Sequence, residues 1–214
     1  MSSFVSLEDV KKIYQMGEVQ IMAAAGIDFQ IERGEFAVVV GPSGAGKTTV
    51  LNILGGMDTA SSGRVIVDGK DIAQYSPRQL TAYRRDDIGF VFQFYNLIPN
   101  LTALENVQLK NNLTGYKKKK EILAFFEKLG LSDKLNVKAG KLSFGQQQRV
   151  AFIRALCQPF DFLFLDEPIS HLDDDNSRIM GELIIGEAKK QQAGVIATSI
   201  GKHIELPYQR ILQL

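Results

Sequence analysis

The sequence has few of the features that mark secreted or membrane-embedded proteins. It contains one cysteine, Cys157, which excludes an internal disulfide and is typical of a reducing compartment. Because Cys157 lies in an apolar stretch, we expect its thiol to be buried and inert. No apolar run approaches the roughly 18 residues of a membrane-spanning helix, and the N-terminus has no signal-peptide pattern. These absences predict a soluble, cytoplasmic protein that depends on another chain for any membrane span.

Neither sign of charge dominates the sequence. The 214 residues include 25 Lys and Arg against 24 Asp and Glu, a formal net charge of +1, which gives no reason to expect a nucleic-acid partner. The only basic block in the sequence, residues 117–120, opens a helical pattern. We interpret it as a solvated helix end, with a contact to lipid or nucleic acid as the alternative.

Short β-type runs alternate with helical patterns along the chain. The β-type runs are residues 4–7, 27–31, 36–40, 64–67, 88–92, 162–165, 195–198 and 210–214. The helical patterns are residues 47–56, 103–113, 117–129, 146–156 and 177–190. Apolar strands separated by helices predict an α/β fold with a mainly parallel sheet, whereas turns at Gly34 and Gly69 favour an antiparallel first part. The strand-free residues 99–141 predict a small helical subdomain inserted into the core.

The most informative motif is Gly-Pro-Ser-Gly-Ala-Gly-Lys-Thr-Thr at residues 41–49. It fits the phosphate-loop pattern and lies between an apolar β-type run and a helical pattern. Glycines let backbone N–H groups surround a polyphosphate, and the following helix offers the positive end of its dipole. Lys47 would reach the β- and γ-phosphates, and the Thr48 hydroxyl would hold Mg²⁺. The residues expected to bind the nucleotide are Ser43, Gly44, Ala45, Gly46, Lys47, Thr48 and Thr49.

A plain glycine-rich turn is the alternative interpretation of this motif, and the full match with its flanks disfavours that interpretation. The sequence therefore predicts a protein that binds a nucleoside triphosphate.

A second motif, Phe-Leu-Phe-Leu-Asp-Glu-Pro, occupies residues 162–168. Four apolar residues followed by two acids predict a buried strand that delivers carboxylates to the edge of the sheet where ligands bind. We expect Asp166 to hold Mg²⁺ and Glu167 to orient and polarise the attacking water. An ordinary junction of strand and loop would explain the same residues, but the phosphate loop upstream favours the functional interpretation.

A third motif, Leu-Ser-Phe-Gly-Gln-Gln-Gln-Arg at residues 142–149, contains a Ser-x-Gly-Gln turn that opens a helix. Such a turn forms an anion site, and its simplest use is to cap a nucleotide that a second copy holds. An ordinary helix N-cap is the alternative, because Ser143 is a preferred cap residue and Gln146 is the third helical residue. Placed just before the apolar-acidic strand, the motif resembles the signature of ATP-binding-cassette (ABC) ATPases, and the resemblance covers essentially the whole chain.

The resemblance implies an ABC-type P-loop NTPase: a mixed sheet flanked by helices, with an antiparallel β region and an inserted helical subdomain. Residues 1–214 would form one nucleotide-binding domain, with the core at about 1–98 and 142–214 and the helical subdomain at about 99–141. The implied ligands are ATP and Mg²⁺. The residues of the signature expected to touch the nucleotide of a second copy are Ser143, Gly145 and Gln146.

The resemblance also assigns roles to residues outside the three motifs. Tyr14 would stack on adenine, with a plain strand-end aromatic as the alternative. Gln93 would reach Mg²⁺ and the attacking water. The segment between Phe94 and Leu101 would dock on a transmembrane permease, or else cover the helical subdomain. Residues 170–173 would cross the dimer interface, without any catalytic role for His171.

Two positions depart from the family. The family places a histidine after its last core strand, near the γ-phosphate, where this chain has Ser199. His203 comes four residues later, and it would reach the same place only if the intervening segment is irregular. The loss of that transition-state donor would lower the rate by about 10²–10³-fold, by analogy with oxyanion holes. Phe144 stands where the family commonly has glycine. The motifs look most like the subgroup that serves lipoprotein release, macrolide export and resistance to antimicrobial peptides.

The sequence therefore predicts the ATPase subunit of an ABC transporter, peripheral on the inner face of a bacterial cell membrane. Two subunits, identical or not, would close head to tail on ATP and drive a separate permease that exports or extracts a lipoprotein, peptide or drug-like cargo. One alternative is an ATP-dependent clamp with impaired hydrolysis, because Ser199 replaces the histidine. The other is a soluble ABC protein of DNA repair or translation, which the lack of long coiled coils disfavours.

Overall fold

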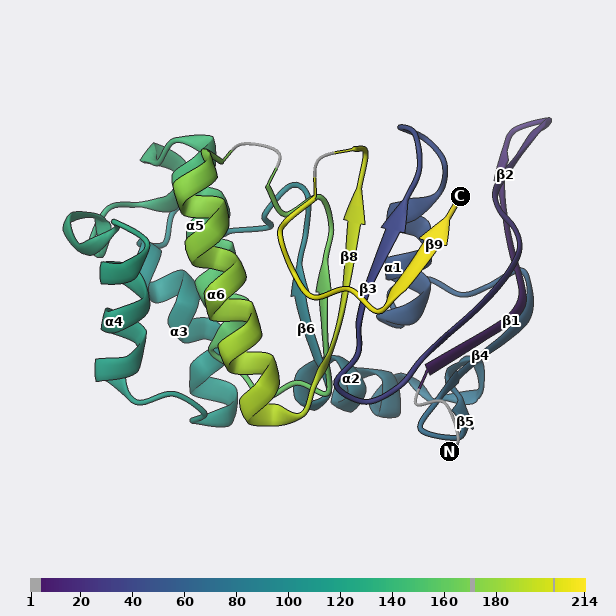
Figure 1. Ribbon diagram of the computed structural model, residues 1–214, viewed down its shortest axis with the longest axis horizontal. Coiled ribbons are helices and arrows are strands. Elements are labelled where there is room, and N and C mark those ends of the chain that lie inside the picture. Colours follow the sequence, from purple (N-terminus) through teal and green to yellow (C-terminus); the bar gives the residue numbers. More distant parts are fainter. Residues whose placement is uncertain (1–4, 170–171, 202) are drawn as a thin grey trace.

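The computed structural model describes residues 5–169, 172–201 and 203–214. Within these residues the chain forms two sheets with helices packed around them (Figure 1). The larger sheet has five parallel strands in the order β6-β7-β8-β3-β9. These strands are β3 (Phe36–Val40), β6 (Ile88–Val91), β7 (Phe162–Leu165), β8 (Gly194–Ser199) and β9 (Arg210–Gln213). Because all five run in one direction, their carboxyl ends meet at one edge of the sheet, towards which β3, β8 and β9 point in Figure 1.

The central strands are apolar because both faces of the sheet are covered. In β7, Phe162 and Phe164 pack into the core between the two sheets, whereas Leu163 and Leu165 pack into the core under the helices. All four side chains are fully buried. This burial on both faces explains why the strand is an uninterrupted apolar run instead of an alternating one.

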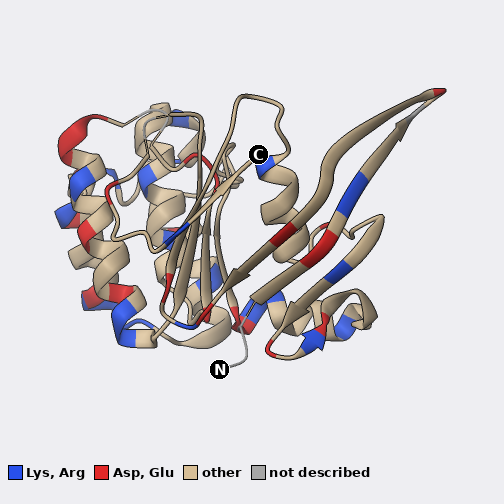
Figure 2. Cartoon of the chain, turned by 45° about the vertical axis from the view of Figure 1, so that its right-hand side comes forward, with Lys and Arg blue, Asp and Glu red and all other residues tan. Residues whose placement is uncertain are grey.

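The smaller sheet is antiparallel, as the turn residues predict, with the order β2-β1-β4-β5. Its strands are β1 (Val5–Met16), β2 (Val19–Ile31), β4 (Ser62–Val67) and β5 (Lys70–Asp71). Helix α1 (Lys47–Leu54) lies between the two sheets and fills the space with Val50, Leu51, Ile53 and Leu54. The β1–β2 hairpin is much longer than the two short runs that the sequence predicts, and it projects from the rest of the chain (Figure 2).

The remaining helices lie mainly on the other side of the parallel sheet (Figure 1). They are α2 (Pro77–Asp86), α3 (Ala103–Thr114), α4 (Lys119–Lys128), α5 (Phe144–Leu156) and α6 (Asp174–Gln191). Three short 3₁₀ turns are η1 (Ile72–Gln74), η2 (Ser132–Lys134) and η3 (Ala139–Lys141). The part of the chain between residues 99 and 141, all of it described, contains α3, α4 and one isolated bridge between Thr102 and Lys138, but no strand. The division into a core and a helical subdomain stays a prediction.

Sequence reasoning missed helix α2, although its start carries a recognisable signal. Ser76 and Gln79 form a reciprocal capping box, and Pro77 occupies the first helical position. The helix lacks a strong apolar stripe, because Tyr83 is its only buried residue. Periodicity therefore could not reveal it, but the cap residues could.

The interpretation of residues 117–120 as a solvated helix end is right for three of the four lysines and wrong for Lys117. Its ammonium is buried and lies 2.7 Å from the Glu187 carboxylate of α6, which is equally buried. Lys190 also contacts Glu187 at 2.7 Å. Cys157 is buried as expected, and burial raises the pKa of its thiol to about 12.

We expect Glu187→Gln to lower the free energy of unfolding by about 3 kcal/mol, because the substitution leaves the buried Lys117 ammonium without its closest carboxylate. The double variant Lys117→Met/Glu187→Leu should recover most of this loss, since it removes both buried charges. Urea unfolding followed by circular dichroism measures both. The matched control is the exposed pair of Arg178 and Glu182, 2.7 Å apart on the same helix, where Glu182→Gln should change stability by only about 0.3–0.5 kcal/mol. Equal losses at the two sites would contradict the prediction.

Candidate functional site

The predicted phosphate loop connects the end of β3 to the start of α1. Gly44 and Gly46 have φ angles of 80° and 92°, in the left-handed region that favours glycine. A Cβ atom on Gly46 would lie 1.8 Å from the carbonyl oxygen of Ala23, so no other residue fits there without rearrangement of β2. The loop is thus a tight backbone cradle at a helix N-terminus, which suits a polyphosphate.

Lys47 is nearly fully buried at the first position of α1. Its ammonium donates hydrogen bonds to the carbonyl oxygens of Gly41 (2.9 Å) and Pro42 (2.8 Å). It also lies 3.8 Å from the Glu167 carboxylate. The charge is therefore held inside the loop by oxygen atoms, which phosphate oxygens could replace.

Two hydroxyl groups converge on the carboxylate of Asp166, which follows β7. Thr48 donates to one carboxylate oxygen at 2.9 Å and Thr198 donates to the other at 2.8 Å. Asp166 is buried, and the parallel direction of β3, β7 and β8 brings all three residues to one edge of the sheet. Hydroxyl and carboxylate oxygens are ligands that Mg²⁺ prefers, so Thr48 and Asp166 fit this metal.

Glu167 adopts a left-handed backbone conformation, with φ 47°, immediately after Asp166. Its backbone N–H donates to the Thr198 hydroxyl (2.9 Å), and the Gln93 side-chain amide donates to its carboxylate (3.2 Å). Burial raises the pKa of Glu167, the Lys47 ammonium opposes that rise, and the neighbouring Asp166 adds to it. A carboxylate with a raised pKa beside a phosphate loop is suited to accept a proton from water.

Sequence reasoning missed Thr198, whose hydroxyl holds both acidic residues in position. The available signal was a polar residue near the end of an otherwise apolar strand, at the sheet edge where ligands bind. Because Thr198 is buried, its hydroxyl contacts groups inside the protein, namely the Asp166 carboxylate and the Glu167 backbone N–H.

Ser199 and His203 lie in different surroundings. Ser199 is buried, its hydroxyl accepts a hydrogen bond from the Gly201 backbone N–H (3.1 Å), and it lines a cavity of about 380 Å³ together with Glu167. His203 is exposed, its ring lies 5.5 Å from the Tyr208 ring, and it lines a separate cavity with Asp174. Ser199 is thus the residue beside Glu167.

The cavity that Ser199 shares with Glu167 has room for a larger side chain. We therefore expect Ser199→His to raise the ATP turnover number by at least about tenfold, since one transition-state donor contributes about 10²–10³-fold. Ser199→Ala serves as the control for removal of the hydroxyl alone. Steady-state phosphate release measures all three proteins. If Ser199→His leaves the turnover number unchanged or lowers it, position 199 does not lack a transition-state donor.

Tyr14 lies in β1 near the phosphate loop. Its hydroxyl donates to Asp58 (2.7 Å), the Lys12 ammonium lies 4.9 Å from its ring centre, and Lys12 contacts Asp58 at 2.6 Å. Burial and the hydrogen bond to Asp58 raise the pKa of Tyr14, whereas a hydrogen bond with Thr49 of α1 lowers it. These contacts fix the ring beside the helix that follows the loop, and its role with adenine stays a prediction.

The Ser-x-Gly-Gln turn forms the start of α5. Ser143 is the N-cap, its hydroxyl accepts from the Gln146 N–H (3.3 Å), and its own N–H donates to the Gln146 side chain (3.0 Å). The structure therefore shows the N-cap that the alternative interpretation predicts, and the contact with a nucleotide stays a prediction. Gly145 follows Phe144, whose side chain is 70% exposed.

The segment after Gln93 is held by two side chains from the helices. Arg154 of α5 donates to the carbonyl oxygens of Tyr95 (2.7 Å) and Asn96 (2.6 Å). Asn106 of α3 is fully buried and accepts from the Ile98 N–H at 2.8 Å. Phe94 is 84% exposed. Of the predicted interface loop 170–173, Ser170 and His171 lie outside the described residues.

Comparison with known proteins identifies the family. The family model described as ABC transporter matches residues 24–170. The chain is 42% identical over 186 residues to an uncharacterized ABC transporter ATP-binding protein of Thermotoga maritima, covering 86% of this chain and 80% of that protein. It is 38% identical over 213 residues to the lipoprotein-releasing system ATP-binding protein LolD 2 of Chlorobaculum tepidum, covering 96% and 86%. The chain therefore belongs to the ABC transporter family, as an ATP-binding subunit and an ATPase.

Other relatives and solved structures agree with this assignment. The chain is 37% identical to the macrolide export ATP-binding/permease protein MacB of Hyphomonas neptunium over 84% of its own length, but it spans only 28% of that protein. It matches the dimeric post-hydrolysis structure of the ATP-binding cassette MJ0796 bound to ADP and Pi, with a TM-score of 0.83 and 38% identity over 91% of this chain and 87% of that one. None of the helices in the described residues is long and apolar enough to cross a membrane.

Proposed function

We propose that this chain hydrolyses ATP at the site formed by residues 41–49, Asp166, Glu167 and Gln93, and that it thereby powers a separate transmembrane permease. The observation that carries the proposal is a pair of neighbouring contacts. The Thr48 hydroxyl lies 2.9 Å from the Asp166 carboxylate, and the Lys47 ammonium lies 3.8 Å from the Glu167 carboxylate. By analogy with relatives named for lipoprotein release and macrolide export, the cargo would be a lipoprotein, peptide or drug-like molecule. The chain would act on the cytoplasmic face of the membrane.

Each side chain has a defined part in this reaction. Lys47 exchanges its carbonyl partners for oxygens of the β- and γ-phosphates. Thr48, Asp166 and Gln93 would hold Mg²⁺, which neutralises charge on the phosphates when bound. Glu167 orients water and accepts its proton as the oxygen attacks the γ-phosphorus and the bond to ADP breaks, giving ADP and phosphate.

The second subunit completes the site. Ser143, Gly145 and Gln146 of one copy would contact the γ-phosphate that the other copy holds, so ATP favours the closed dimer over separate chains. The solved relative MJ0796 is itself described as dimeric. The clamp with impaired hydrolysis, the alternative from the sequence, gains no support from the comparisons.

The dimer is tested by size-exclusion chromatography of Glu167→Gln with and without ATP. We expect dimers with ATP and monomers with ADP. The variant Glu167→Gln/Ser143→Arg should stay monomeric with ATP, because the bulky cation blocks the turn, and its ATP binding should be retained. If Glu167→Gln binds ATP but elutes as a monomer at every concentration, the proposed pair of identical subunits is wrong.

The permease would dock on the segment between Phe94 and Leu101. Phe94 and Ile98 expose apolar side chains there, and Arg154 connects the segment to α5. Because Gln93 precedes the segment and contacts Glu167, a change at the γ-phosphate would be passed to the docked permease through this short stretch of chain.

A further inference from the structure

The loop that carries Glu167 is held by three different elements. The Asp166 backbone N–H donates to a carbonyl oxygen of β6 (2.9 Å), and the Glu167 N–H donates to the Thr198 hydroxyl of β8 (2.9 Å). Pro168 has no N–H, and its carbonyl oxygen accepts a hydrogen bond from the side-chain amide of Gln148 at 2.6 Å. Gln148 belongs to α5, so the loop is connected to that helix as well as to the sheet.

The contact between Gln148 and Pro168 lies inside the protein. Gln148 is 1% exposed and Pro168 is buried. Among the described residues the Gln148 side-chain oxygen has no hydrogen-bond partner, so the amide makes this one contact. A hydrogen bond is directional, whereas the packing of Ile169 against the core under the helices is not. Gln148 therefore sets the direction of the Pro168 carbonyl.

The backbone of Glu167 needs support from its surroundings. Its φ of 47° lies in the left-handed region, which costs a non-glycine residue free energy and persists only where neighbouring groups hold it. The Thr198 hydroxyl fixes the chain on one side of Glu167, and the Gln148 amide fixes it on the other. The carboxylate that we assign to the attacking water is thus aligned from both sides.

Helix α5 also carries the turn that would contact the nucleotide of the second copy. Ser143 is the N-cap of this helix, and Gln148 lies in its second turn. A helix moves as a rigid element, so a shift of Ser143 towards the second nucleotide would move Gln148 and, with it, the Pro168 carbonyl. The helix therefore connects the turn that serves one ATP with the carboxylate that serves the other.

We propose that Gln148 is a positioning residue for hydrolysis. It aligns Glu167 through the Pro168 carbonyl, and it makes this alignment depend on the contact of Ser143 with the nucleotide of the second copy. The inference rests on the proposed function, since it presumes that Glu167 is the base and that ATP closes a dimer. Gln148 is buried and acts through the loop, so its loss should slow hydrolysis and leave ATP binding intact.

The first variant is Gln148→Met, which keeps much of the length of the side chain and removes the amide donor. We expect the turnover number to fall about 10- to 100-fold, because misplacement of a catalytic group by about 1 Å can cost about 10²-fold. The dissociation constant of ATP should change by less than about twofold, because the phosphate loop supplies most of the binding contacts. Steady-state phosphate release and isothermal titration measure the two quantities on the same protein.

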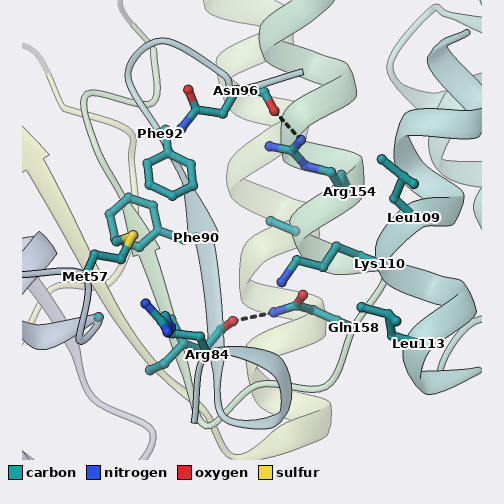
Figure 3. A pocket seen from close by; sticks show the side chains of 13 residues that line it. Met57, Arg84, Phe90, Phe92, Asn96, Leu109, Lys110, Leu113, Arg154 and Gln158 are labelled. Atoms are coloured by element: carbon teal, nitrogen blue, oxygen red, sulfur yellow. Dashed lines mark hydrogen bonds between the residues drawn. The ribbon is translucent and has the colours of Figure 1, made fainter. Parts of the chain in front are cut away.

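The matched control is Gln158→Met. Gln158 is also 1% exposed, its side-chain amide donates to the carbonyl oxygen of Ile88, and its own oxygen has no hydrogen-bond partner among the described residues (Figure 3). Ile88 begins β6, at the end of the sheet away from Glu167. Gln158→Met should therefore lower the unfolding midpoint about as much as Gln148→Met does, but it should keep the turnover number of the wild type.

Two double-mutant cycles separate positioning from a general loss of structure. Gln148→Met should not lower further the residual rate of Glu167→Gln, measured in single turnovers with protein in excess of ATP, because a positioning residue has no effect without the group that it positions. Ser143→Ala should lower the turnover number by a smaller factor in the Gln148→Met protein than in the wild type, because part of its effect passes through Gln148.

Equal turnover numbers of the wild type and a folded Gln148→Met protein would overturn the inference, and so would a further loss in the Glu167→Gln background. An equal effect of Ser143→Ala in the two proteins would refute the connection to the second nucleotide. The proposed function fails on different results: a wild type without phosphate release, or a Glu167→Gln protein that binds ATP and stays monomeric.

Discussion

Glu167→Gln should lower the steady-state rate of phosphate release by about 10²- to 10⁴-fold, the range that general bases contribute. Glutamine is nearly isosteric with glutamate and can still contact Gln93, but it cannot accept a proton from water. ATP affinity should hardly change, because the phosphate loop supplies most of the contacts. The measurement is a coupled phosphate assay at saturating ATP, together with a binding titration of the same protein.

The control for this variant is Glu182→Gln, which changes an exposed glutamate on α6 in the same way. It should retain the full rate. If wild type and Glu167→Gln both release phosphate near the background rate, the chain is a clamp, as the alternative from the sequence supposes. If both are fast, another group accepts the proton.

Lys47→Met should weaken ATP binding by about 100-fold. Each charge-assisted hydrogen bond contributes about 1.5–3 kcal/mol, and a loss of 2.7 kcal/mol corresponds to roughly that factor. Methionine keeps much of the length of the side chain while removing the ammonium that now lies 2.9 and 2.8 Å from the loop carbonyls of Gly41 and Pro42. Isothermal titration of ATP into the two proteins measures the change.

Folding must be checked beside binding, because Lys47 is buried. Removal of a buried charge stabilises the folded protein, whereas the loss of a donor for two carbonyl oxygens destabilises it. Because these two effects oppose each other, we expect the unfolding midpoint to shift little. Lys141→Met, at an exposed position, is the control. Unchanged ATP affinity in a folded Lys47→Met protein would show that the lysine does not bind phosphate.

Much of the fold could be predicted because local patterns specify it. Apolar runs such as residues 162–165 follow directly from burial on both faces of a sheet, and the phosphate-loop motif requires glycines where φ is positive. Helix α2 and the length of the β1–β2 hairpin escaped prediction. Helix α2 is mostly polar, and the hairpin exposes apolar side chains such as Val19, Ile21 and Met22, so neither segment shows the apolar periodicity of a buried element.

The sequence indicated the acidic and phosphate-loop residues that the structure brings together in the candidate site, but not all the hydrogen bonds that hold them there. Glu167 and Asp166 were recognisable from the strand that precedes them. Thr198, which positions both, became visible only when β8 was placed beside β7. The charge at position 117 was misassigned because its partner, Glu187, lies 70 residues away along the chain.

The sequence by itself determined the class of protein, because phosphate chemistry requires particular residues at fixed short spacings, and such motifs are visible directly in the sequence. Only the tertiary structure decided which distant side chains share a space. Thr198 contacts Asp166 across 32 residues of sequence and Lys117 contacts Glu187 across 70, and nothing in the spacing of these residues predicts either pair. That arrangement depends on how the helices pack against the sheet, and packing is set by the shapes of all the buried side chains together.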